Sequence, residues 1–230
     1  MTFTEVSSPD LAALWLTVRL AFVVTVILLI IATPAAWALS RMRSRFKPVI
    51  EAVVALPIVL PPTVLGFYLL VAFNPSAPIG RFWVDATGDT LAFSFAGLVV
   101  ASVIYSLPFA VQPLQTAFEA VGREPLEAAA TLGASPLDAF VTVAAPLAVR
   151  GFATAIVLSF AHTLGEFGVV LMVGGNIPGE TRVVSIAIYE HVETLQYAEA
   201  NALALTLLGL SFSALLFTYA FNRRPALHVG

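Results

Sequence analysis

His162 and Glu166 are ionisable residues four positions apart in a segment that is otherwise apolar. An imidazole and an acid at this spacing share one face of an α-helix, where they could pass a proton or line the path of an ion. Backbone groups near Gly165 and Gly168 could instead satisfy the carboxylate, so both interpretations stay open. Direct binding of an oxyanion by Glu166 is disfavoured, because like charges repel strongly in a low dielectric.

Hydroxyl groups are better suited to contact an oxyanion, since they donate hydrogen bonds as backbone N–H groups and arginines do. The hydroxyls placed to do so, each with simple packing as the alternative, are those of Thr63, Thr163, Thr181 and Ser185. We therefore predict a pathway or gate that contains Thr63, Thr163, His162 and Glu166.

Catalytic chemistry has little support in the sequence. The three histidines, His162, His191 and His228, are dispersed, and none begins a metal-ligand motif. The chain has no cysteine, no nucleophile–base arrangement and no G-x4-G-K-[ST] phosphate-binding loop. We expect no catalytic residue, no metal and no bound cofactor, so any ATP would act on a separate subunit.

Composition defines the elements that position these residues. Hydrophobic residues make up 59% of the 230 residues and charged residues 11%, against about 25% charged in soluble domains. Apolar runs long enough to cross a bilayer recur along the chain. We predict an all-α polytopic membrane protein, one domain over 1–230, with spans at about 17–39, 49–73, 91–118, 151–173 and 201–221.

Basic residues orient the predicted spans. If the spans alternate, the loops after the first, third and fifth spans share one side, and these carry Arg41, Arg43, Arg45, Lys47, Arg123, Arg150, Arg223 and Arg224. The other side has only Arg81, Arg182 and, near the start of the first span, Arg19. The positive-inside rule then predicts an outside N-terminus and a cytoplasmic C-terminus.

Two segments allow alternatives. Residues 19–40 resemble a signal peptide with an A-x-A site at Ala36 and Ala38, but cleavage there would leave a basic start on the outer face, so we predict an uncleaved helix. Residues 181–198 are too polar to span, and we place them outside as an amphipathic or partly re-entrant helix.

The stretch 123–147 is predicted to form a cytoplasmic helix pair. Glu124-Pro125 is typical of a helix start, and Gly133 fits the left-handed position that ends a helix. Ser135 and Asp138 then form a variant capping box for a second helix that closes at Pro146. The small residues 128–130 favour close approach of another protein over binding to lipid.

This stretch resembles the coupling loop of ABC importer permeases, E-A-A-x3-G-x9-I-x-L-P, with Val143 and Ala145 replacing the Ile and Leu. The resemblance implies that the loop sits in a cleft of an ATP-hydrolysing subunit, whose movements drive the permease. The residues it assigns to ATPase coupling are Glu127, Ala128, Ala129, Gly133 and Pro146.

Further blocks, "LPIVLPPTVLGFYLL", "SLPFAVQPLQTAFEAV" and "HTLGEFGVVLMVGGNIPGETRVVSIAIY", are similar to the molybdate importer permeases. The resemblance implies transport of molybdate, or of the chemically close tungstate, across a bacterial inner membrane. It further implies a homodimer with two cytoplasmic ATP-binding subunits and a periplasmic or extracellular binding protein, and no nucleic acid. The alternatives are a sulfate/thiosulfate permease and a proton-driven secondary anion transporter based on His162 and Glu166.

Overall fold

A computed structural model of the protein describes residues 7–222. Within this range the chain is helical, and the structure contains α1 (Ser8–Arg41), α2 (Lys47–Val59), α3 (Pro62–Phe73), α4 (Pro78–Thr87), α5 (Phe95–Val121), α6 (Glu124–Thr131), α7 (Pro136–Ala139), the π-helix η1 (Phe140–Ala144), α8 (Ala145–Leu147), α9 (Val149–Leu164), α10 (Gly168–Gly174), α11 (Val184–Glu193) and α12 (Tyr197–Asn222). The prediction of an all-α fold is confirmed.

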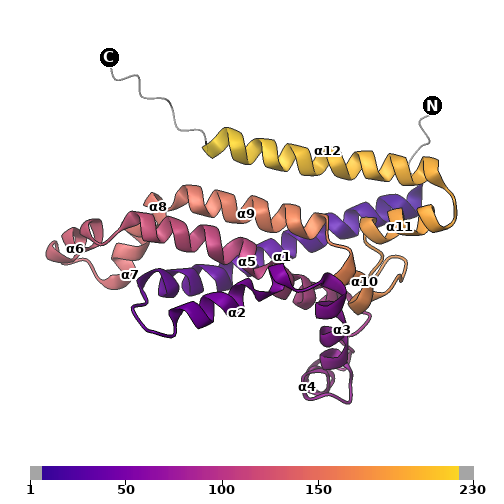
Figure 1. Ribbon diagram of the computed structural model, residues 1–230, viewed down its shortest axis with the longest axis horizontal. Coiled ribbons are helices and arrows are strands. Elements are labelled where there is room, and N and C mark those ends of the chain that lie inside the picture. The colour runs from indigo at the N-terminus through magenta and orange to yellow at the C-terminus, as the bar shows by residue number, and fades with distance from the viewer. Residues whose placement is uncertain (1–6, 223–230) are drawn as a thin grey trace.

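Three helices, α1, α5 and α9, run side by side through the centre of the molecule (Figure 1). The buried positions of α1 recur every three or four residues from Ala13 to Leu39, so one stripe of this helix faces its neighbours. Leu20, Leu28, Leu98, Leu114 and Ala155 form part of the core between the three helices. Following the orientation predicted from the basic residues, we call the end that carries Arg41 and α6 the inner end, and the end that carries Asp10 and α11 the outer end.

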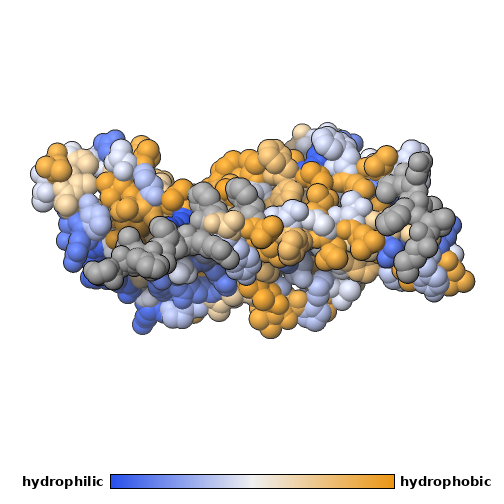
Figure 2. Space-filling view, turned by 90° about the horizontal axis from the view of Figure 1, so that it is seen from above, coloured by the Kyte–Doolittle hydropathy of each residue, from blue (hydrophilic) through white to orange (hydrophobic). Residues whose placement is uncertain are grey.

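The outer surface of the bundle exposes many apolar side chains, as expected for a surface in contact with lipid. Apolar residues cover the middle of the face seen in Figure 2, and hydrophilic residues gather toward the end that carries α6. Helix α12 lies along one side and exposes Leu208, Phe212 and Leu216. Among residues 7–222, three helices are long and apolar enough to cross a membrane, or up to five if each bent pair is one span, which agrees with a fold of about five spans.

The second predicted span, 49–73, is not one straight helix. Helices α2 and α3 meet at an angle of 107°. Leu60 and Pro61 are both extended because each precedes a proline, and a residue before proline is pushed out of the helical region. The chain breaks there, and α3 and α4 project to one side of the bundle (Figure 1).

The fourth predicted span, 151–173, is also broken. Helix α9 ends at Leu164, Gly165–Phe167 is not helical, and α10 begins at Gly168. A Cβ on Gly168 would lie 2.7 Å from the Cβ of Pro62, and one on Gly66 would lie 2.7 Å from the Cβ of Met172. These glycines let α3 and α10 pack closely, so the two breaks lie next to each other.

The segment 181–198, predicted as an outer helix, contains α11. Val184, Ile186 and Ala187 on α11 are buried against the bundle, whereas Tyr189 and Val192 are exposed. Helix α11 is therefore packed against the core at its start and exposed at its end.

Candidate coupling surface and pathway cavity

Helix α6 and helix α7 form the inner helix pair. Pro125 lies in the first turn of α6, where a missing N–H costs nothing. Gly133 has φ +86°, the left-handed conformation predicted for it. Ser135 and Asp138 form both hydrogen bonds of the predicted capping box. Because these hydrogen bonds with the Ser135 side chain and backbone stabilise the carboxylate, they hold the pKa of Asp138 below its usual value.

The second helix continues beyond the predicted pair. From α7 the chain runs through η1 into α8, and Pro146 lies inside this run. The chain then bends by 71° into α9. The inner helix pair is therefore joined to α9 by a bent but nearly continuous helix, which can pass a movement into the bundle.

Exposure divides the predicted coupling residues. Glu127 and Ala128 are exposed, but Ala129 is partly buried and packs against the cluster of Leu126, Ala139 and Ala144. Of the small residues 128–130, the exposed ones are therefore available to another protein, whereas Ala129 packs inside the helix pair. Sequence reasoning missed Leu132 and Leu137, which are 89% and 70% exposed. Large apolar residues this exposed on a polar loop were the available signal for a docking surface.

A cavity of about 540 Å³ lies beside the two breaks. It is lined by Pro62, Thr63, Tyr105, Ala161, His162 and the run from Gly165 to Gly168. The structure therefore brings together three of the four predicted pathway residues, Thr63, His162 and Glu166. We call this space the pathway cavity.

Thr163, the fourth predicted pathway residue, does not line the pathway cavity. Its hydroxyl is buried, donates to the carbonyl oxygen of Ser159 at 2.9 Å and lies 3.2 Å from the Oγ of Ser106. Thr163 instead packs α9 against α5. The alternative of simple packing fits this residue.

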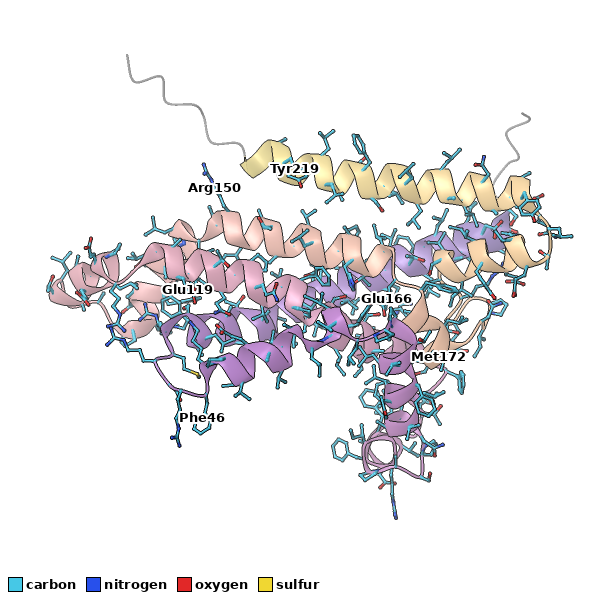
Figure 3. All side chains as sticks on the ribbon, in the orientation of Figure 1. Phe46, Glu119, Arg150, Glu166, Met172 and Tyr219 are labelled. Carbon is cyan, nitrogen blue, oxygen red and sulfur yellow. The ribbon has the colours of Figure 1, made fainter. Side chains whose placement is uncertain are left out.

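His162 and Glu166 are not on one helical face, because α9 ends before Glu166. His162 Nδ1 lies 2.9 Å from Ser106 Oγ, and its ring stacks on Phe109 with the centroids 4.0 Å apart. Glu166 is 4% exposed, and within residues 7–222 neither of its carboxyl oxygens has a hydrogen-bond partner. Figure 3 places Glu166 in the interior, where α9 ends.

A polar group on the inner halves of α2 and α5 was not predicted. Gln115 Nε2 donates to Glu51 at 2.6 Å and to Glu119 at 3.0 Å, and Lys47 pairs with Glu119 at 2.9 Å. These residues lie near a cavity of about 470 Å³ lined by Glu51, Gln112, Gln115 and Thr116. Polar side chains within a predicted span were the signal, because they cost free energy unless they face water or a partner.

Basic residues gather at the inner end. The guanidinium of Arg41 lies 3.7 Å from the centre of the Trp37 ring, and Arg41 and Arg123 line one cavity with Glu119 and Glu127. Arg182 lies at the outer end, 3.9 Å from Asp10. Among the described residues, no three His, Asp or Glu side chains come together as a metal site.

Comparison with known proteins agrees with this geometry. Residues 28–226 match the family described as "binding-protein-dependent transport system inner membrane component". The chain is 59% identical to the molybdenum transport system permease protein ModB of Azotobacter vinelandii, over 96% of this chain and 97% of that one. It is 31% identical to a probable sulfate transport system permease protein of Helicosporidium sp. subsp. Simulium jonesii, over 90% and 76%.

The fold is also that of a solved importer. The structure matches a bacterial ABC transporter involved in the import of the acidic polysaccharide alginate, with a TM-score of 0.75 and 16% identity, over 96% of this chain and 81% of that one. At this identity the likeness concerns the fold alone. Together with the long and close sequence match, these findings show that the chain belongs to the binding-protein-dependent transport system inner membrane components, in the group of molybdenum transport permeases.

Proposed function

We propose that the chain is the membrane-spanning permease subunit of an ATP-driven molybdate importer. The observation that carries the proposal is the 59% identity to a molybdenum permease along nearly the whole of both chains. In this proposal the permease is a homodimer with two ATP-hydrolysing subunits at its inner end. An external binding protein delivers molybdate or tungstate at the outer end, so that the N-terminus is outside and the C-terminus is cytoplasmic.

The inner helix pair would receive the force of ATP hydrolysis. Glu127, Ala128, Leu132 and Leu137 present a surface of one acidic, one small and two large apolar side chains on which another protein can pack. In this proposal Gly133 and Pro146 set the shape of the pair, and Ala129 holds it together. No residue of this chain hydrolyses ATP.

Movement of the inner helix pair would reach α5 and α9 together. A Cβ on Gly151 would lie only 2.3 Å from the Cβ of Ala117 and 3.1 Å from the carbonyl oxygen of Pro113. Such close packing transmits displacement rather than absorbing it. The two helix breaks beside the pathway cavity then become the places where the bundle can bend.

The pathway cavity would be a transit point and not a tight binding site. Its donors are the hydroxyl groups of Thr63 and Tyr105 and the ring of His162, and no lysine or arginine of the described residues lines it. Neutral donors contact an oxyanion without holding it as strongly as a charged group would. Specificity would then rest largely on the external binding protein.

Uptake of labelled molybdate tests the proposal. The chain, its ATPase and its binding protein are reconstituted in vesicles, with sulfate as competitor. We expect uptake that requires ATP and the binding protein and that excess sulfate does not suppress. Sulfate transport in preference to molybdate would favour the sulfate group, in which a 31% identical relative is found. Uptake driven by a proton gradient without ATP would contradict the proposal.

A further inference from the structure

Helix α11 connects the outer end of α1 to the break between α9 and α10. Two positions on α1 hold it. The backbone N–H of Val184, at the start of α11, donates to Thr17 Oγ1 at 2.8 Å. Nε2 of His191, near the end of α11, lies 3.0 Å from Oδ1 of Asp10. Asp10 and Thr17 are both buried, and they are seven residues apart, hence on one face of α1.

Other residues of α11 contact the break between α9 and α10. The hydroxyl of Ser185 donates to the backbone carbonyl oxygen of Glu166 at 2.6 Å. One turn further along α11, the ring of Tyr189 meets the ring of Phe167, with the centroids 5.1 Å apart. Ser185 and Tyr189 are four residues apart, so one face of α11 touches two successive residues of the break.

The hydrogen bond from Ser185 has a specific reason to exist. Where a helix breaks inside a membrane protein, the freed carbonyl groups need new partners, because unsatisfied backbone groups are costly there. Ser185 supplies the partner for Glu166 from a different helix. A shift of α11 must therefore either move the break or give up this bond.

The far end of α11 is open to the outside of the bundle. Tyr189, Val192, Leu195 and Tyr197 are exposed around the turn that joins α11 to α12. Arg182, which is 3.0 Å from Glu190, ties the preceding segment to α11. A partner that docks on the outer end would therefore push on an element that is connected to the pathway cavity.

We propose that α11 relays docking of the external binding protein to the break at Glu166, and that Ser185 is the positioning residue of this relay. The relay rests on the proposed function, because it requires that an external binding protein docks. Ser185 acts through the backbone of Glu166 and need not touch the transported anion. Loss of its hydroxyl should weaken the response to the binding protein without removing the ATPase subunits.

The test compares Ser185→Ala with Ser185→Thr and Ser213→Ala in the complete complex. Ser213 is a matched control, because its hydroxyl also donates to a carbonyl, that of Gly209 at 2.7 Å, but within its own helix α12. ATP hydrolysis is measured in vesicles with and without molybdate-loaded binding protein. The readout is the ratio of stimulated to basal rate, together with the amount of ATPase retained on purification.

We expect Ser185→Ala to lower this ratio by about fivefold, the factor that one net hydrogen bond contributes. Ser185→Thr, which keeps the hydroxyl, should restore the ratio, and Ser213→Ala should match the wild type. A wild-type ratio in Ser185→Ala would overturn the relay. If Ser185→Ala does not assemble, Tyr189→Leu can be used instead, because it removes the ring contact with Phe167. A wild-type ratio in Tyr189→Leu would also overturn the relay. A wild-type complex with no response to loaded binding protein would instead count against the proposed function.

Discussion

The inner helix pair and the helix break at Glu166 are built in opposite ways. In the inner helix pair the polar contacts are local: Ser135 bonds Asp138, three residues away, and Thr142 bonds the carbonyl oxygen of Asp138, four residues away. Gly133 needs only its own backbone conformation. This region is exposed, and its caps are satisfied within a few residues.

The break depends on residues far away in sequence. Ser106 meets His162 across 56 positions, and Val184 meets Thr17 across 167. Glu166 lies among them without a hydrogen-bond partner for its carboxyl group within the described chain. The contrast teaches that the inner helix pair is a surface that can be changed without unfolding the bundle, whereas a change at the break acts on the bundle itself.

The largest effect is expected at the break, from Gly168→Val. The valine side chain would collide with Pro62, because even the first added carbon, Cβ, would lie 2.7 Å from the Cβ of Pro62. Overpacking costs about 1–3 kcal/mol, and we expect the melting temperature to fall by about 5 °C with near-complete loss of uptake. The control is Gly209→Val in α12, where nothing in the described structure lies within 4 Å of the added Cβ. Equal melting temperatures of Gly168→Val and Gly209→Val would show that the close packing at Gly168 does not contribute to stability.

Gly133→Val should have the next largest effect, and of a different kind. Valine at φ +86° is strained, by about 1–2 kcal/mol, but the position is exposed. We expect normal melting of the bundle, weaker retention of the ATPase subunits and uptake reduced about tenfold. Gly133→Asn should be milder, because asparagine tolerates the left-handed region. Unfolding of the whole protein by Gly133→Val would show that the inner helix pair is not independent.

Glu166→Gln should have an intermediate effect that separates charge from packing. The substitution keeps the shape of the side chain and removes its ability to ionise. We expect uptake to fall about fivefold with assembly intact, measured by labelled molybdate and by recovery of the complex. Glu180→Gln, at an exposed outer position, is the control. Wild-type uptake by Glu166→Gln would show that transport does not need an ionisable group at this position.

The smallest effect concerns pH at the outer end. Burial lowers the pKa of His191, but hydrogen bonds with Asp10 and Gln196 outweigh it and raise the pKa above its ordinary value. Because the pKa of His191 is higher in the folded protein than in the unfolded chain, protonation stabilises the folded state. This stabilisation is complete below the unfolded pKa of about 6.5 and is lost as the pH rises through the pKa of the folded state.

The melting temperature of the wild type should therefore fall by about 1–2 °C between pH 6 and pH 8. Arg182, 3.9 Å from Asp10 and 3.0 Å from Glu190, shares the site. Asp10→Asn keeps an acceptor but removes the charge, so it should flatten the slope. An equal slope in this variant would show that another group is responsible.

Much of the inner helix pair followed from its sequence, because each signal there is local. Proline at a helix start, glycine at a left-handed corner and a serine cap act through their nearest neighbours. The same local reasoning failed at Glu166. It assumed a continuous helix through Gly165, whereas α9 ends at Leu164 and α10 begins at Gly168, where α3 and α10 pack closely.

The split of the alanine face has the same origin. Ala128 and Ala129 are identical in type and adjacent, and only Ala129 packs against the buried cluster of Leu126, Ala139 and Ala144. The unpredicted group of Glu51, Gln115 and Glu119 likewise required two spans to be placed side by side.

The sequence by itself determined the membrane class, the all-α fold, the local form of the inner helix pair and, by similarity, the transporter group. The length of an apolar segment and the capping preferences of a helix depend on a few residues or one span, so they can be recognised in the sequence alone. Tertiary structure alone decided that the two breaks lie side by side, which hydroxyls line the pathway cavity and how α11 joins α1 to Glu166. These features depend on which helices come into contact, and contacts between distant residues are fixed only when the whole bundle packs.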